Sequence, residues 1–413
     1  MAVKINRKID RSRIGYARRK KRGGNGVFAM LVLLGSIFAG AYLLLQTRLG
    51  GGISLARRDG TPTQGIAPTP TRSFDDFVKQ AEAAEARGAY RSAIELLDQA
   101  SRRRPNDPDL HRRVARLLVF LNQPEKAEAR ARKALELKAD HAPSRAVLCM
   151  AVEWQKRIDE AIGECRAALE LEPKLVEAHA YLSEALADKE DFNGALSSGQ
   201  QALDLDANNT DALRNMGYLY FVFGRYDTAL EYFRRALDVN PNLPVVLVGM
   251  AKIHITWAAA GAETAVINGN AETAAQLLEQ AIALDDQNAE AYERLGEAQR
   301  IRGEFDKSGL AFDKALKLEP ERISAYTRRG VLRFQRYAFL GAIDDYTRAI
   351  SLTRAISKTI SPTDYTFLGY AQQLAGRCDD ARLTMGDALQ ISPDNEYLAA
   401  SAREIEGRCA GKF

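Results

Sequence analysis

The sequence has few of the residues that most often carry catalysis or bind metals. Four histidines and four cysteines are spread over 413 residues. The chain contains no Gly-rich phosphate loop, no His-Glu-x-x-His pair and no Gly-x-Ser-x-Gly elbow. These absences argue against an enzyme, and the sequence predicts no cofactor and no metal site.

Positive charge is concentrated at the start of the chain and is outweighed by acid after it. Residues 1–26 hold ten Lys and Arg against one acid, Asp10, so this segment carries +9. The whole chain carries +4, which leaves −5 for residues 27–413 by difference. Because a nucleic-acid-binding domain needs a basic stripe, we expect no nucleic-acid partner.

One long apolar run follows the basic tail. The 19 residues from Val27 to Leu45 contain no charge and one polar side chain, Ser36. As a helix they would reach about 28 Å, close to the thickness of a hydrocarbon core. The Lys and Arg excess before the run predicts a transmembrane signal-anchor helix over residues 27–46. Residues 1–26 would be a cytoplasmic tail, and the repeat-containing body would lie outside the cytoplasm.

A cleaved signal peptide is the alternative interpretation of this run. Ala39-Gly40-Ala41 resembles a cleavage site, but cleavage there would leave Tyr42 and three leucines as an apolar terminus. We therefore favour an uncleaved anchor in the cell membrane. Ser36 and Gly40 are four residues apart, a spacing that lets two membrane helices approach closely and would allow a homo-oligomer.

Residues 47–73 are rich in Gly, Pro and Thr and show no apolar period. They are predicted to form a linker that holds the body away from the bilayer. The uncleaved basic anchor and the Pro-Thr linker together look bacterial.

From Phe74 onward the chain repeats itself every 34 residues. Two alanine series show this spacing: Ala93, Ala127, Ala161, Ala195 and Ala229, and Ala100, Ala134, Ala168, Ala202 and Ala236. Within residues 210–243, apolar residues follow helical spacing twice, on either side of Gly224-Arg225. Glycine permits the positive φ that ends a helix, and Pro241 cannot continue one. One unit is therefore a pair of helices, which must stack on its neighbours to bury its apolar faces.

One set of residue types recurs at fixed places in these units. It comprises Leu213, Met216, Gly217, Tyr220, Ala229, Phe233, Ala236 and Pro241 in one unit. It returns as Tyr292, Leu295, Gly296, Phe312, Ala315 and Pro320, and again as Tyr365, Leu368, Gly369, Ala381, Met385, Ala388 and Pro393. Through these residues the chain resembles the tetratricopeptide repeat family over residues 74–395. The units begin at residues 74, 108, 142, 176, 210, 244, 289, 323 and 362.

The resemblance implies an all-α fold. We expect a right-handed superhelical solenoid of about nine helix pairs, with residues 396–413 as a C-terminal capping helix and tail. Two units are longer than 34 residues, with the excess at residues 258–270 and 353–361. Insertions in solenoids fall in loops, so these segments are expected to be loops. They would lie either at the binding face or elsewhere on the surface as tolerated extra length.

The resemblance also bears on the cysteines and histidines. Cys149 and Cys165 occupy the sites of Gly217 and Phe233, which face each other across the hairpin in this family. Cys378 opens the second helix of the last unit, and Cys409 closes the capping helix, which should run back antiparallel. Both pairs are candidate disulfides, which an exported body would allow, and the alternative is four buried thiols. His111 and His179 fall at one equivalent first-helix site and are predicted to pack rather than to bind metal.

In this family the first helices line a concave groove that binds segments of other proteins. The repeat register places ten residues of this chain in that groove: Arg214, Tyr218, Phe221, Val248, Lys252, Ile255, Glu293, Glu297, Phe334 and Tyr370. An apolar and aromatic centre beside an acidic strip at Glu290, Glu293 and Glu297 suits a peptide with hydrophobic anchors and some basic residues.

The sequence thus predicts a non-enzymatic, membrane-anchored interaction scaffold whose repeats lie outside the cytoplasm. Its partners would be proteins of envelope or secretion assembly, or exported clients that it chaperones. The alternative is a structural tether whose membrane helix or linker, rather than its groove, recruits partners.

Overall fold

The computed structural model describes residues 72–356 and 358–411. These residues belong to one compact unit, residues 70–413. The predicted basic tail (1–26), the anchor (27–46) and all but the last two residues of the linker (47–73) lie outside the described residues. Among the helices that the structure does describe, none combines the length and apolar character needed to span a bilayer.

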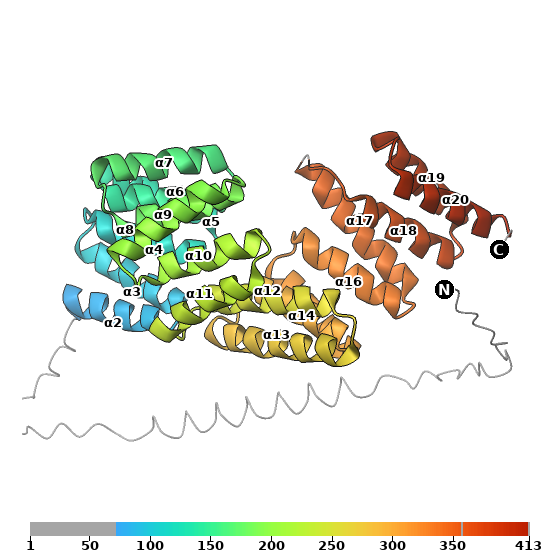
Figure 1. Ribbon diagram of the computed structural model, residues 1–413, viewed down its shortest axis with the longest axis horizontal. Coiled ribbons are helices and arrows are strands. Elements are labelled where there is room, and N and C mark those ends of the chain that lie inside the picture. Colours follow the sequence, from blue (N-terminus) through green and yellow to red (C-terminus); the bar gives the residue numbers. More distant parts are fainter. Residues whose placement is uncertain (1–71, 357, 412–413) are drawn as a thin grey trace, which may run out of the picture. The chain divides into compact units, whose positions relative to one another are not determined.

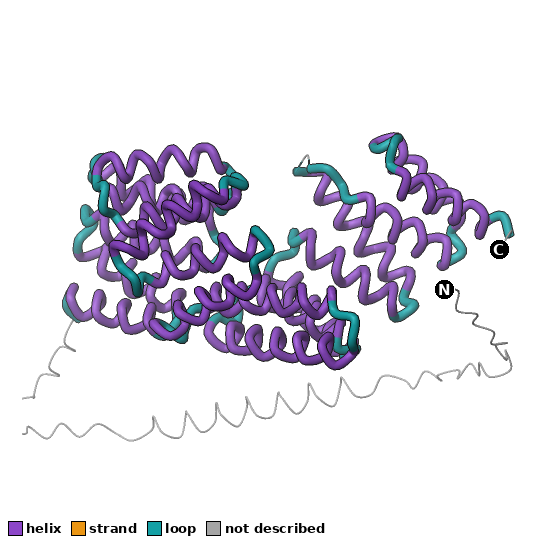
Figure 2. The backbone as a smooth tube through the Cα atoms, viewed as in Figure 1, coloured by secondary structure: helices purple, strands orange, loops and turns teal. Residues whose placement is uncertain are grey.

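The described residues form nineteen helices, and all of their regular secondary structure is helical (Figures 1 and 2). Nine of the helices open hairpins: α2 (Phe74–Ala86), α4 (Pro108–Phe120), α6 (Ala142–Glu153), α8 (Val176–Asp188), α10 (Thr210–Val222), α12 (Pro244–Ala260), α14 (Ala289–Ile301), α16 (Ile323–Gln335) and α18 (Pro362–Leu374). Each begins at the residue from which its sequence unit was counted.

The second helices complete the hairpins, and one further helix follows them. They are α3 (Tyr90–Arg103), α5 (Pro124–Leu137), α7 (Ile158–Leu171), α9 (Phe192–Leu205), α11 (Tyr226–Val239), α13 (Thr264–Leu284), α15 (Phe305–Leu318), α17 (Phe339–Ala355) and α19 (Cys378–Ile391), followed by α20 (Glu396–Cys409). The prediction of an all-α repeat solenoid is confirmed.

Short polar side chains start several first helices. The side chain of Asn209 accepts hydrogen bonds from the backbone N–H groups of Asp211 and Ala212. Asn288 and Asn395 cap α14 and α20 in the same way. Such caps satisfy N–H groups that have no partner inside the helix. They help to fix where these helices begin.

The two alanine series lie where helices approach most closely. Ala93, Ala127, Ala161, Ala195 and Ala229 are fully buried, and so are all five members of the second series. Gly217 serves the same purpose on α10, because a Cβ there would lie 2.5 Å from the Phe233 ring. Small side chains at these sites allow the two helices of a hairpin to pack tightly.

The expectation of a loop is wrong for the first insertion and holds for most of the second. Most of residues 258–270 extends the helices of its unit, so that α12 has 17 residues and α13 has 21. Only Gly261, Ala262 and Glu263 connect them. The segment is rich in alanine, the best helix former, and Ala258 and Ala271 are buried against the partner helix. In the second insertion, α17 continues to Ala355, and residues 358–361 belong to the connection to α18.

The apolar core changes character along the array. One cluster of buried residues runs from α2 to α12, and another joins α12 to α15. Between α15 and α16 the core shrinks to Ala315, Leu316 and Ala325. A separate cluster then joins α17 to α20, in which Leu398 and Ile405 of α20 are buried against α18 and α19. In Figure 1 α20 lies beside these two helices.

Candidate peptide-binding site

The first helices of six consecutive units converge on one cavity of about 320 Å³. Its lining comes from the units that begin at residues 108 to 289: Phe120, Asn122, Glu153, Trp154, Lys156, Glu184, Arg214, Tyr218, Phe233, Val245, Val248, Gly249, Lys252, Asn288 and Glu290. Ligand pockets are typically about 300–1,000 Å³, so this cavity can hold one or two side chains of a bound segment.

Half of the ten groove residues expected from the sequence come together here. Arg214, Tyr218, Val248 and Lys252 line the cavity. Phe221 lies beside them, because the ammonium of Lys252 is 5.5 Å from the centre of its ring. The remaining candidates are Ile255, Glu293, Glu297, Phe334 and Tyr370, which do not line it.

Four of the ten residues are too buried to form an open groove surface. Arg214, Val248, Ile255 and Glu293 are all at most 8% exposed. The sequence register placed them on the correct helices but could not show how closely neighbouring first helices pack on one another. These four side chains are therefore buried, whereas the repeat register led us to expect them on an open groove surface.

The acidic strip on α14 is also corrected, because basic side chains occupy its three carboxylates. Glu290 lies 3.6 Å from the ammonium of Lys252, and Glu297 accepts from Arg300 at 2.8 Å. Glu293 is paired with both Arg322 and Arg328. Burial tends to raise the pKa of Glu290, but Lys252 and Arg294 outweigh it and hold that pKa below its usual value. The strip therefore offers no free negative charge to a basic partner.

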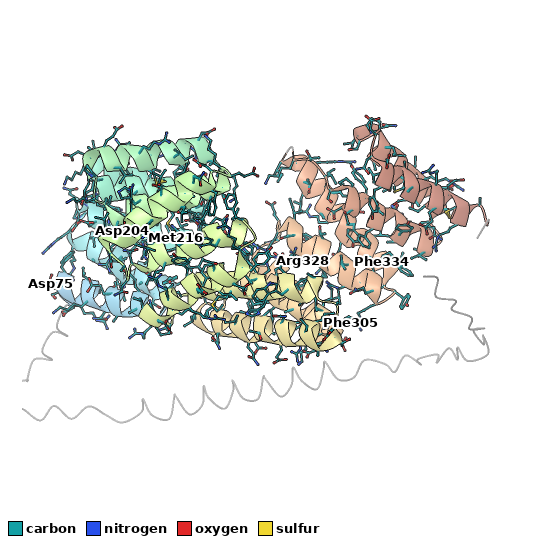
Figure 3. All side chains as sticks on the ribbon, in the orientation of Figure 1. Asp75, Asp204, Met216, Phe305, Arg328 and Phe334 are labelled. Atoms are coloured by element: carbon teal, nitrogen blue, oxygen red, sulfur yellow. A yellow bond between two sulfur atoms is a disulfide. The ribbon has the colours of Figure 1, made fainter. Side chains whose placement is uncertain are left out.

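Phe334 and Tyr370 lie in the last units, away from the cavity. The ring of Phe334 packs edge-on against Phe339 and Phe367. Tyr370 donates a hydrogen bond to Glu404 on α20 at 2.6 Å. Figure 3 labels Phe334 and Arg328 on α16 and Met216 on α10. Phe334 thus contacts α17 and α18, and Tyr370 links α18 to α20.

A salt bridge across the array limits access to the first helices. Arg116 on α4 donates two hydrogen bonds of 2.9 Å to Asp211 on α10, three units further along the chain. Tyr181 on α8 donates to the same carboxylate at 2.7 Å. Burial acts to raise the pKa of Asp211, but Arg116 outweighs it and keeps that pKa low.

An ion pair and a tryptophan form one side of the cavity. Arg214 donates to both carboxylate oxygens of Glu184, at 3.0 and 2.8 Å, and both residues are buried. The indole N–H of Trp154 donates to the same carboxylate at 3.2 Å. The Nε of Arg214 is buried without an acceptor. The indole of Trp154 thus contributes aromatic surface to this side of the cavity.

A second polar cluster lies next to this pair. Asp188 accepts hydrogen bonds from Lys156 and from the hydroxyl of Tyr218. Lys156 also lies 3.4 Å from Glu153, which is 2% exposed. Burial, the negative charge of Glu184 and a hydrogen bond with Asp188 raise the pKa of Glu153 to about 9. At neutral pH Glu153 is therefore a neutral carboxylic acid.

Sequence reasoning missed Phe120, Glu153, Trp154 and Glu184. Glu184 occupies the same place in its unit as Tyr218 and Lys252, and Glu153 the same place as Phe221. Applying the register to the units at 142 and 176 would have identified both acids. Phe120 and Trp154 lie one residue after the repeat position of Phe221, at or just after the end of a first helix. The repeat pattern does not specify which residue type occurs there.

The structure joins the four cysteines as Cys149–Cys165 and Cys378–Cys409, with Cα–Cα distances of 5.3 and 5.7 Å. Both distances lie in the usual range for disulfides. The first bridge links the two helices of one hairpin, and the second links the start of α19 to the end of α20.

The histidines are dispersed. His111 and His179 are buried, and the Nε2 of His179 donates to the carbonyl of Pro173 at 3.0 Å. Within residues 72–356 and 358–411, no group of three or more His, Cys, Asp or Glu side chains could hold a metal ion.

Known structures share this fold. An APC/C hetero-tetramer Cut9-Hcn1 structure aligns with a TM-score of 0.54 and 13% identity, covering 80% of this chain and 55% of that one. A structure of the human IFIT1 dimer with m7Gppp-AAAA also gives 0.54, at 16% identity, covering 78% of this chain and 91% of that one. At these identities the likeness concerns the fold alone.

Sequence comparison finds a curated relative and matches to repeat models. Human "Protein O-mannosyl-transferase TMTC1" is 22% identical over 201 residues, which is 48% of this chain but only 21% of that protein. Three tetratricopeptide repeat models match residues 84–148, 210–243 and 260–325. Such repeats generally bind other proteins, and their fold is typical of non-enzymatic scaffolds. The matches support the presence of tetratricopeptide repeats in these parts of the chain.

Proposed function

We propose that this chain is a non-enzymatic interaction scaffold that is anchored in the membrane by residues 27–46 and carries its repeats outside the cytoplasm. It binds peptide segments of partner proteins through the cavity on its first helices. Its partners belong to envelope or secretion assembly, or are exported clients that it chaperones.

The cavity is the observation that carries the binding proposal. Phe120, Trp154 and Tyr218 give it aromatic walls, and Val245 and Val248 add apolar surface. Aromatic anchors in desolvated pockets contribute most of the energy of many protein interfaces. A segment that inserts one side chain here would bury that side chain among parts of six units.

Two features support the location outside the cytoplasm. The charge of +9 on residues 1–26 is on the side of the apolar run that the positive-inside rule assigns to the cytoplasm. The two cysteine pairs lie at bonding distance, and disulfides persist mainly in exported proteins.

A structural tether is the second candidate, and the self-pairing of the first helices favours it. Arg116 is engaged by Asp211, and Arg214 by Glu184, so much of the polar surface of these helices is already occupied. In this case the membrane helix or the linker would recruit partners.

Filling the cavity separates the two candidates. Val245 lines it, so Val245→Trp should occupy its space, whereas Val266 is 47% exposed on α13 and serves as the matched position. Full-length wild type, V245W and V266W would be crosslinked in intact membranes, and captured partners identified by mass spectrometry. Circular dichroism would check that each variant is folded.

For a binding scaffold, V245W should lose partners that wild type and V266W both retain. If folded V245W keeps all of them, while replacing residues 27–73 with an unrelated membrane anchor and linker abolishes capture, the tether is correct. A reporter enzyme that is active only outside the cytoplasm, fused after Phe413, would test the orientation. An inactive reporter would contradict the proposed location.

A further inference from the structure

We propose that the cavity receives a primary ammonium group of the bound segment, held by the carboxyl groups of Glu153 and Glu184 beside Trp154. The inference rests on the proposed function, because it names the chemical group that a bound peptide places in the cavity.

Carboxyl groups beside the cavity outnumber the basic side chains that pair with them. Helices α6 and α8 bring three buried or half-buried carboxyl groups together, those of Glu153, Glu184 and Asp188. Only two cations accompany them. Arg214 is committed to Glu184 by two hydrogen bonds, and Lys156 lies between Glu153 and Asp188. Three carboxyl groups therefore share two cations, and Lys156 donates to both Glu153 and Asp188.

Glu153 is the more weakly paired of the two acids that share Lys156, because its contact is 3.4 Å long and that of Asp188 is 2.5 Å. Burial acts to raise the pKa of Asp188, but hydrogen bonds with Glu153, Lys156 and Tyr218 outweigh it and keep that pKa low. Burial, the negative charge of Glu184 and a hydrogen bond with Asp188 raise the pKa of Glu153. The proton thus resides on Glu153 and takes the place of a third cation.

The other charged groups around the cavity do not compensate Glu153. Lys252 of α12 pairs with Glu290 of α14 on the opposite wall and contacts the Phe221 ring. Helix α10 contributes Arg214 and Tyr218, which are bonded to Glu184 and Asp188. Helix α4 contributes Phe120, whose ring lies near the guanidinium groups of Arg116 and Arg214, and Arg116 is paired with Asp211.

The walls suit a cation attached to a peptide. Aromatic faces attract ammonium groups, and Trp154 and Tyr218 line the cavity.

Binding is then an exchange of one cation for another. The O–H bond of Glu153 breaks, the proton passes to solvent, and the carboxylate pairs with the arriving ammonium. The ammonium can come from a lysine side chain or from a free N-terminus. Both have the same chemistry, and the choice of peptides distinguishes them.

The test uses three short peptides on the full-length protein in detergent. The first is acetyl-Ala-Lys-Ala-amide, and the second replaces its lysine with norleucine, which lacks the ammonium. The third is Nle-Ala-Ala-amide with a free N-terminus. The chain has two tryptophans, so Trp257→Phe leaves Trp154 as the reporter of binding. Calorimetry in two buffers of different ionisation enthalpy measures proton release at pH 7.5.

We expect an ammonium-bearing peptide to bind about tenfold more tightly than the capped norleucine peptide, with release of up to one proton. Tighter binding of the first peptide would identify a lysine side chain as the source of the ammonium group. Tighter binding of the third would identify a free N-terminus. Glu153→Gln keeps the shape but cannot ionise, so it should abolish both the preference and the proton release while binding the norleucine peptide normally.

Two outcomes would overturn the inference, and they have different consequences for the proposed function. Equal binding of all three peptides without proton release would refute the ammonium site but leave a peptide-binding cavity in place. Absence of binding by every peptide, with Trp154 unperturbed, would also remove the cavity from the proposed function.

Discussion

At the residue scale, most turns between the helices contain a residue in the left-handed region, and half of these residues are not glycine. Eight of the nine hairpins pass through one residue with positive φ, which is glycine at Gly88, Gly224, Gly303 and Gly376. The other four use Asn122, Lys156, Glu190 and Tyr337. A side chain in the left-handed region costs roughly 1–2 kcal/mol, and asparagine tolerates it best.

Glu190 offers a test of this cost, because it is exposed and has a φ of 65°. Glu190→Gly should raise the free energy of unfolding by about 1 kcal/mol, because glycine adopts this conformation without strain. Urea denaturation measures the change. Glu190→Ala keeps the Cβ and should give no comparable gain; an equal gain would show that the side chain, rather than the backbone, is the source.

Glu153 gives the second prediction at this scale. Its pKa is about 9 in the folded protein against a usual value of 4.5. The unfolded chain therefore loses this proton first as pH rises, and the contribution of Glu153 to stability falls between about pH 4.5 and pH 9. Glutamine does not titrate, so the stability of Glu153→Gln relative to wild type should grow with pH, by up to about 1.4 kcal/mol per unit.

The measurement is the urea midpoint of each protein at pH 5, 6.5 and 8. Glu170→Gln, at an exposed site on α7, is the control and should show no such trend. A constant difference between Glu153→Gln and wild type across this range would mean that Glu153 is ionised in the folded protein.

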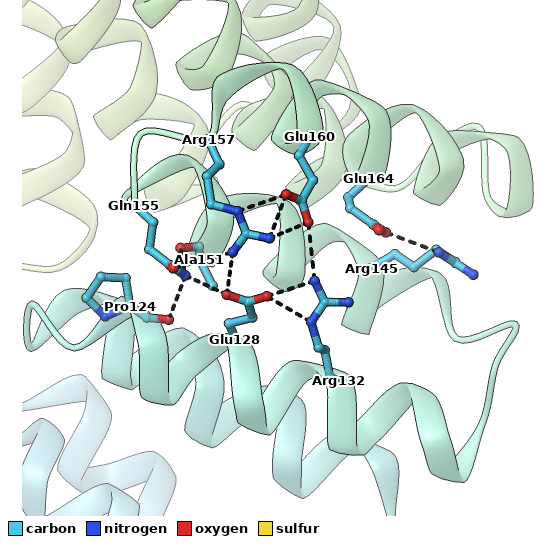
Figure 4. A network of polar contacts seen from close by, with 9 residues as sticks. All are labelled: Pro124, Glu128, Arg132, Arg145, Ala151, Gln155, Arg157, Glu160 and Glu164. Carbon is cyan, nitrogen blue, oxygen red and sulfur yellow. Dashed lines mark hydrogen bonds and ion pairs between the residues drawn. The ribbon is translucent and has the colours of Figure 1, made fainter. Parts of the chain in front are cut away.

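At the element scale, the helix pair is the unit of stability, and its two helices meet at alanine. Polar networks supplement this contact between neighbouring units. In Figure 4, Glu128 of α5 accepts from Arg132 on its own helix and from Gln155 and Arg157, which follow α6. Arg157 also donates to Glu160 on α7. These two neighbouring units are thus joined by hydrogen bonds as well as by apolar packing.

Ala236→Glu tests the packing at this scale. Ala236 is fully buried, and a carboxylate there would have no partner, which should cost about 3 kcal/mol or more. Hydrogen exchange should show α10 and α11 losing protection first. The same substitution at Ala83, which is exposed on α2, is the control and should change stability little. Equal effects at both sites would contradict close packing at Ala236.

At the scale of the whole molecule, repeats that are distant in sequence contact one another. Arg91 in the first unit pairs with Asp285, and the side chain of Asn242 donates to the carbonyl of Ala86 at 3.1 Å. Asn122 donates to Glu319 at 3.2 Å. A simple solenoid has only nearest-neighbour contacts, so these bonds add cooperativity that the repeat model lacks.

The disulfides give the prediction at this scale, because their oxidation depends on the compartment of the whole protein. The native protein should have a mass four hydrogens below that of the reduced chain, two for each of the bridges Cys149–Cys165 and Cys378–Cys409. Reduction should lower stability, by about 3 kcal/mol for the loop closed by Cys149 and Cys165, whose sequence separation is 16. Alkylation of four thiols without reductant would contradict both the bridges and the location outside the cytoplasm.

The local order of this protein could be derived from its sequence. The period of 34, the buried alanines and the turn residues are all local signals, because each reflects contacts within a hairpin or between adjacent hairpins. They were sufficient to assign the all-helical repeat fold and the start of each first helix. The alanine-rich insertion at residues 258–270 was misassigned because its length argued for a loop, whereas its composition favours a helix.

Only the tertiary structure decided what the first helices present to a partner. Whether Arg214 is a free cation or the buried partner of Glu184 depends on how closely α8 and α10 pack, which no period encodes. The pairing of Glu293 with Arg322, the bond from Arg116 to Asp211 and the protonation of Glu153 have the same origin. Electrostatic interactions depend on distance and burial, and these are properties of the assembled array rather than of any one repeat.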